Sequence, residues 1–129
     1  MEKFTIKKEL QGHSQAAVAL AFSPKGDRLV SGGWDNTAIV WDLEKGVSTR
    51  VLTGNAGRVE GIAISADGKR VLTGSLDQKV RLFNADTGEL IQTYDGHTGG
   101  IGKVTLSRNG RYAASGGWDH SVRLWPLPK

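Results

Sequence analysis

The sequence predicts an all-β protein made of three repeated units, each a small sheet of antiparallel strands. A period of forty-two residues occurs three times and accounts for all but the last three residues. Within each period, short β-prone runs are separated by turns that contain Gly, and no helical period competes with them. The chain has 18 Gly residues, which agrees with many tight turns.

Four markers define the repeat. Each unit has a Gly followed by His or Asn, then a Ser-x-x-Gly turn, a turn that ends in Asp, and a terminal aromatic residue followed by Asp, Asn or Pro. The four markers are Gly12-His13, 23–26, 31–35 and Trp41-Asp42 in the first unit, Gly54-Asn55, 65–68, 73–77 and Phe83-Asn84 in the second, and Gly96-His97, 107–110, 115–119 and Trp125-Pro126 in the third. They define a single array over residues 1–129, with units of approximately 1–42, 43–84 and 85–126.

The strands follow from the runs between these markers. In the first unit we expect strands at Lys3–Leu10, Ala17–Ser23, Arg28–Gly32 and Thr37–Asp42. In the second of these strands, Ala17–Phe22 is apolar on both faces, as in a strand buried between neighbouring sheets, and this strand should be the innermost. The third unit ends with the strand that contains Leu124–Pro126, so its own fourth strand is missing.

Composition narrows the classes of function. There is no Cys, which excludes disulfides, thiolate nucleophiles and Cys-ligated zinc. Neither a signal peptide nor a run of about 18 apolar residues is present, so a soluble, cytoplasmic protein without a membrane partner is expected. The net charge is +4, but Lys and Arg are scattered, so no specific nucleic-acid partner is predicted. His120 has no companion metal ligands, and no cofactor motif occurs.

With these markers the chain resembles the WD-repeat family, whose repeats fold as the four-stranded blades of a β-propeller. The resemblance implies a hydrogen-bonded relay in each blade, in which His joins a turn Asp to a Ser or Thr, and the Ser or Thr joins a Trp. The corresponding residues are His13, Ser31, Asp35 and Trp41, then Thr73 and Asp77, then His97, Ser115, Asp119 and Trp125.

The second unit departs from this pattern, because Asn55 replaces the His and Phe83 replaces the Trp. We expect the Asn55 amide to donate to Asp77 instead, with one link fewer in this blade. The recurring Ser, His and Asp could also suggest a hydrolase. A nucleophilic Ser needs an exposed position and an oxyanion hole, whereas these Ser residues lie within strands, so a noncatalytic protein is predicted.

Three blades do not make a closed ring, because propellers need about four to eight. Each bare outer face would leave apolar surface in water at a cost on the order of 10 to 20 kcal/mol. We expect closure by homo-oligomerisation with strand exchange, in which Lys3–Leu10 of one copy completes the last blade of another. A dimer would have six blades and a trimer nine. The alternative is a natural or engineered fragment of a larger propeller with a structural or self-assembly role.

The family resemblance also implies a partner-binding face. In WD-repeat propellers, the residue before each turn Asp and two positions after the His lie on one face. A tight turn normally carries polar residues, so large apolar groups there favour an interface with a peptide or protein. The candidate residues are Trp34, Leu76, Trp118, Ala16, Val18, Arg58, Glu60, Gly100 and Gly102.

Overall fold

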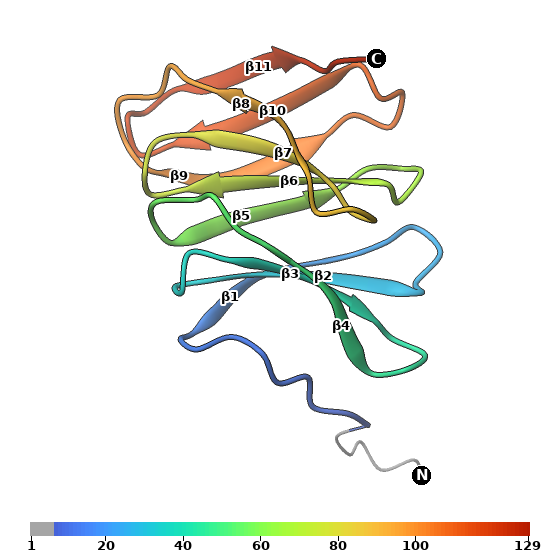
Figure 1. Ribbon diagram of the computed structural model, residues 1–129. Coiled ribbons are helices and arrows are strands. Elements are labelled where there is room, and N and C mark those ends of the chain that lie inside the picture. Colours follow the sequence, from blue (N-terminus) through green and yellow to red (C-terminus); the bar gives the residue numbers. More distant parts are fainter. Residues whose placement is uncertain (1–6) are drawn as a thin grey trace, which may run out of the picture.

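The computed structural model describes residues 7–129, which form three antiparallel sheets without a helix. The first sheet contains β1 (Ala17–Phe22), β2 (Arg28–Gly33), β3 (Ala38–Asp42) and β4 (Val47–Leu52). The second contains β5 (Val59–Ile64), β6 (Arg70–Ser75), β7 (Val80–Asn84) and β8 (Leu90–Tyr94). The third contains β9 (Ile101–Leu106), β10 (Tyr112–Gly117) and β11 (Val122–Pro126). In every sheet the strands pair in chain order, and the sheets stack face to face (Figure 1).

The Ser-x-x-Gly turns explain why β1 reverses into β2. The backbone N–H of Gly26 donates to the carbonyl oxygen of Ser23 at 2.9 Å, and the Ser23 hydroxyl accepts from the N–H of Arg28 at 3.0 Å. Gly26 has φ of 74°, a left-handed conformation that a side chain disfavours. The same bonds recur after β5 and β9, so this short motif sets all three hairpins.

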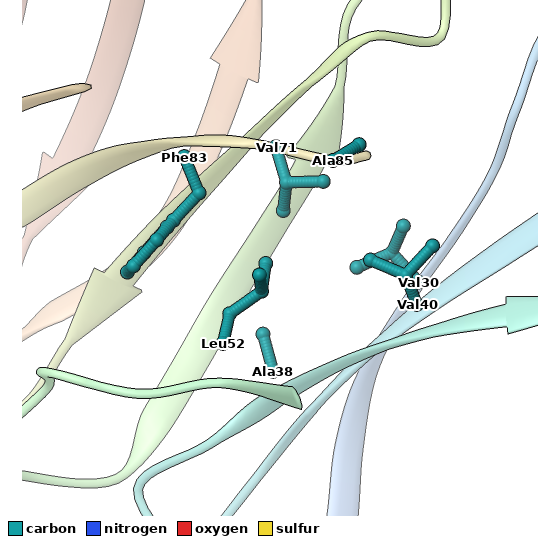
Figure 2. Close-up of a cluster of buried hydrophobic side chains, with 7 residues drawn as sticks. All are labelled: Val30, Ala38, Val40, Leu52, Val71, Phe83 and Ala85. Atoms are coloured by element: carbon teal, nitrogen blue, oxygen red, sulfur yellow. The ribbon is translucent and has the colours of Figure 1, made fainter. Parts of the chain in front are cut away.

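The hydrophobic core lies between the sheets. Figure 2 shows the first of two clusters, in which side chains of the first sheet face Phe83 and its neighbours in the second. Its buried members are Val30, Ala38, Val40, Leu52, Val71, Phe83 and Ala85. The second cluster joins the second and third sheets in the same way; its buried members are Leu72, Val80, Leu82, Tyr94, Ile101 and Ala113. Each sheet therefore depends on its neighbour for a core.

Burial of the first strand differs from the prediction. β5 contacts both β1 and β9, which agrees with an inner position for these strands. However, Val18, Leu20 and Phe22 of β1 are 41%, 66% and 67% exposed, so the expectation that this strand is buried on both faces is wrong. The reason is that β5 lies between two sheets, whereas within residues 7–129 one face of the first sheet has no sheet against it.

The predicted strand Lys3–Leu10 falls in part on residues 1–6, which lie outside the described residues. Lys7–Leu10 form no strand. The third sheet has three strands, and β11 has no strand partner at its outer edge among residues 7–129. Residues 7–129 also contain no helix long and apolar enough to cross a membrane.

Candidate interaction face and blade relay

The first sheet holds a hydrogen-bonded relay that ends at its core. The Trp41 indole N–H donates to the Ser31 hydroxyl oxygen at 2.8 Å, and this hydroxyl lies 2.7 Å from Nε2 of His13. The Asp35 carboxylate can only accept, so Nδ1 of His13 carries the ring proton and donates to Asp35 at 3.1 Å. In this tautomer Nε2 has a free lone pair and accepts from the Ser31 hydroxyl. The relay fixes the histidine tautomer.

The third sheet repeats this geometry. His97 lies 2.7 Å from Ser115 and 2.9 Å from Asp119, and Trp125 donates to Ser115 at 2.9 Å. Both Ser residues of the relays are buried and hydrogen-bonded on both sides. A substrate could not reach a hydroxyl in this position, which supports a structural role for the set.

The turn Asp accepts more hydrogen bonds than the relay alone supplies. Asp35 also accepts from the Thr37 hydroxyl at 2.8 Å and from the backbone N–H of Ser14 at 3.0 Å. Ser121 and Thr98 do the same for Asp119. These donors were not predicted, although Thr37 and Ser121 each lie two residues after the turn Asp and mark the position in the sequence.

These contacts set the ionisation of the turn carboxyls. Burial opposes the charge on Asp35, but bonds from Thr37, Ser14 and His13 outweigh it, so the pKa of Asp35 is lowered. The pKa of Asp119 is lowered for the same reasons, with Ser121 as the leading donor. Both carboxylates are held in the charged form.

The second sheet differs from the prediction. Asn55 does not donate to Asp77; its Oδ1 accepts from Thr73 at 3.2 Å and from Arg81 at 2.8 Å. Arg81 instead pairs with Asp77 at 2.7 Å, with both side chains largely buried. Burial opposes the charge on Asp77, but bonds from Ala56 N–H and Arg81 outweigh it and lower its pKa.

Arg81 thus replaces the missing His as the donor to the turn Asp. The exchange leaves one polar atom without a role, since Nδ2 of Asn55 is buried and has no hydrogen-bond partner within residues 7–129. The role of Arg81 was not predicted, because the third unit also carries an Arg at that position, Arg123, beside an intact relay.

The residues predicted for the partner-binding face lie at one end of the sheets. The backbone N–H groups of Trp34, Leu76 and Trp118 donate to the carbonyl oxygens of the loop residues Ala16, Arg58 and Gly100, at 2.9, 2.9 and 2.8 Å. Each apolar turn residue is therefore fixed beside the loop that precedes the first strand of its own sheet.

The three apolar turn residues differ in exposure. Trp34 is 37% exposed, because the Arg58 guanidinium carbon lies 3.9 Å from the centroid of its ring. Leu76 is half-buried and lies against Gly100. Trp118 is 72% exposed. Trp34 is partly used in packing between blades, whereas Trp118 presents most of its surface to solvent.

A hollow of about 510 Å³ lies beside Trp118 and brings together residues from all three sheets. The predicted residues Val18, Glu60 and Gly102 line it, and so do Lys103 and His120, which were not among the predicted site residues. Lys103 adds a positive charge to the face that carries the predicted residues Arg58 and Glu60. No cluster of three or more potential metal ligands occurs within residues 7–129.

Two four-stranded sheets and one three-stranded sheet, stacked face to face with this relay in the first and third, are typical of a segment of a β-propeller. The family WD domain, G-beta repeat (WD40) matches residues 4–42, 46–84 and 88–126. The chain belongs to the WD40 family.

Individual relatives match about a third of the chain in sequence. It is 46% identical over 43 residues to the small ribosomal subunit protein RACK1 of Dictyostelium discoideum, which is 33% of this chain and 13% of that protein. It is 44% identical over 41 residues to protein groucho of Drosophila melanogaster, or 32% of this chain and 6% of that protein.

Among solved structures, the WD40 repeats of RRP9 match with a TM-score of 0.86 and 25% identity, over 91% of this chain and 37% of that one. The chain thus spans only a small part of the length of the curated relatives it matches.

Proposed function

We propose that this chain is a noncatalytic protein-interaction scaffold that binds a peptide or protein segment with apolar anchors on the face bearing Trp34 and Trp118. WD40 domains typically mediate protein–protein interaction, which supports the class of function. The observation that carries the specific site is the 72% exposure of Trp118 in a tight turn. A large aromatic side chain at such a position is typical of a binding hot spot.

The neighbouring charges favour a particular kind of ligand. Glu60 and Lys103 both line the hollow beside Trp118, so a segment with an apolar anchor and mixed charges would complement this face. Arg58 stacks on Trp34 and restrains its ring, which reduces the entropy lost when a ligand packs against it.

The test is capture of partners by immobilised protein, with quantitative mass spectrometry of what is bound. We expect the double variant Trp34→Ala, Trp118→Ala to lose the proteins that the unsubstituted chain enriches. Leu90→Ala is the matched control, since it removes a side chain that is 44% exposed on β8 and should leave capture unchanged. Far-ultraviolet circular dichroism checks that each variant folds. Unchanged capture by the double variant would reject this face.

We also propose that copies of the chain assemble into a ring, either a dimer with six blades or a trimer with nine. The three-stranded third sheet and the exposed apolar residues of β1 support this proposal. Light scattering after size-exclusion chromatography should give two or three times 13.8 kDa, maintained on dilution. A single-chain mass at every concentration would contradict it.

The second candidate is a piece of a larger propeller with a structural or self-assembly role. The small share of each relative that the chain spans favours this candidate. It predicts that capture experiments enrich nothing reproducibly, whatever the residues at 34 and 118.

A further inference from the structure

We infer that the two uncovered sheet faces are the two halves of one interface: the outer face of the third sheet, with the free edge of β11, docks on the first sheet and the N-terminal segment of a second copy. This inference rests on the proposed self-assembly and is tested separately from peptide binding on the face bearing Trp34 and Trp118. Four observations carry it, and each compares residues forty-two positions apart.

The first observation concerns the faces themselves. The chain has two junctions, by which we mean the packed contacts between the first and second sheets and between the second and third. At these junctions, positions 38 and 40 of the first sheet and 80 and 82 of the second are apolar and completely buried against the next sheet. Their equivalents in the third sheet, Val122 and Leu124, are 84% and 67% exposed. This face therefore has the composition of a junction without a covering sheet.

The complementary surface is on the first sheet. Ile62 and Ile64 of the second sheet pack against the core of the first junction, and Val104 and Leu106 of the third sheet pack against the core of the second. The equivalent side chains of the first sheet are Leu20 and Phe22, which are 66% and 67% exposed. The chain thus carries both partners of a third junction at its opposite ends, where they cannot meet within one copy (Figure 1).

The second observation is an unfilled space beside one of three equivalent glycines. A Cβ on Gly32 would lie 2.6 Å from Cγ1 of Val59, and one on Gly74 would lie 2.6 Å from Cγ2 of Ile101. In both junctions the next sheet fills the space that the glycine leaves. The equivalent Gly116 has nothing within 4 Å. The residue equivalent to Val59 and Ile101 is Ala17, which is exposed.

The third observation concerns the N-terminal segment. A Cβ on Gly88 would lie 3.4 Å from Cδ of Arg50, which belongs to the fourth strand of the preceding sheet. A Cβ on Gly46 would lie 2.8 Å from Cδ of Lys8, the residue equivalent to Arg50. Lys8 therefore occupies the place of a preceding blade's fourth strand. β11 of a second copy would supply the pairing edge that this segment lacks.

The fourth observation is at the turn residues. Arg58 of the second sheet stacks on Trp34 of the first, and Gly100 of the third lies against Leu76 of the second. Trp118 has no equivalent partner within residues 7–129. The repeat places Ala16 of a second copy beside it, so one edge of the hollow next to Trp118 is completed only in the assembly.

Two variants block one face each. Leu124→Asp places a charge on the third sheet and Phe22→Asp places one on the first, both at side chains already exposed to solvent. Each variant alone should run as a single chain of 13.8 kDa in light scattering. An equal mixture retains one good pair of faces and should give a complex of two chains that grows no further. Leu90→Asp is the control and should assemble like the unsubstituted chain.

Cysteine cross-linking tests the register, since the chain has no Cys. In the existing junctions the Cβ separations would be 3.3 Å for Gly32 and Val59 and 3.4 Å for Gly74 and Ile101, close to those of a disulfide. We expect the variant Ala17→Cys, Gly116→Cys to oxidise into covalent rings of two or three chains. The control Gly32→Cys, Val59→Cys should form its disulfide within one chain.

The outcomes separate the proposals. If the control cross-links but Ala17→Cys, Gly116→Cys does not, or if the unsubstituted chain stays single at every concentration, the interface is rejected. If the cross-link instead joins long open chains, the interface stands and the closed ring is rejected. The two proposals have separate readouts, because peptide binding is measured by capture with and without the Trp34 and Trp118 side chains, whereas the interface is measured by mass and by cross-linking.

Discussion

The turn aspartates show how one position can be satisfied in two ways. In the first and third sheets, a His and a hydroxyl group supply the hydrogen bonds to Asp35 and Asp119. In the second sheet the guanidinium of Arg81 replaces both. In this sheet the turn carboxylate is part of a buried ion pair, and a buried charge is stable only while its partner remains.

We therefore predict that Arg81→Met destabilises the protein by about 3 kcal/mol, because Asp77 then stays buried without its counter-charge. Urea unfolding followed by tryptophan fluorescence gives the free energy of unfolding. The control is Arg123→Met at the equivalent position of the third sheet, where Asp119 keeps its His97 and Ser121 donors and the loss should be smaller. Equal losses in the two variants would show that the Arg81 ion pair is not the cause.

The same carboxyls predict the response to acid. The pKa of Asp35, Asp77 and Asp119 is lower in the folded chain than the value of about 3.9 expected after unfolding. Their contribution to stability is therefore fully present above about pH 5, and it is lost as the pH falls through and below 4. Urea unfolding between pH 3 and pH 7 should show this decline.

The control for this acid response is Asp119→Asn. It is expected to be less stable than the unsubstituted chain at pH 7 and to lose less stability between pH 7 and pH 3. An unchanged pH profile in the variant would contradict the role of this carboxyl.

At the scale of strands and turns, the sequence is a good guide wherever structure depends on local chemistry. β2 and β3 lie within one residue of the expected strands, because Ser-x-x-Gly and the Asp turns define their ends. The exposure of β1 was not predictable in this way, since a repeat buries its apolar side chains only if another sheet covers them. The Arg81–Asp77 pair could not be predicted either, because the third unit carries an equivalent Arg123 while its turn Asp119 pairs with His97.

Equivalent glycines should respond differently to the same substitution. Gly74→Ala would place a Cβ 2.6 Å from Cγ2 of Ile101, so we predict a loss of about 2 kcal/mol from overpacking. Gly116→Ala meets nothing within 4 Å in a single chain, so its effect on a dilute monomer should stay within about 0.5 kcal/mol. Urea unfolding in a Leu124→Asp background, which keeps the chain single, measures both. A comparable loss for Gly116→Ala would mean that this site is already filled.

At the scale of the whole molecule, stability is shared between neighbours. Each junction between sheets is a separate cluster of apolar side chains, so the middle sheet is supported on both faces and the outer sheets on one. In a linear repeat array the terminal units are the least stable, and anything that covers their outer faces stabilises the whole array. Self-assembly would supply such a cover in this chain.

This dependence on neighbours gives the last prediction. If assembly contributes to stability, the midpoint of thermal unfolding rises with protein concentration, because mass action favours the associated folded state. We expect a rise of several degrees between about 1 and 100 μM, measured by differential scanning fluorimetry. Leu124→Asp should unfold at one temperature throughout this range, at or below the lowest midpoint of the unsubstituted chain. A concentration-independent midpoint in both proteins would mean that three sheets are stable without a second copy.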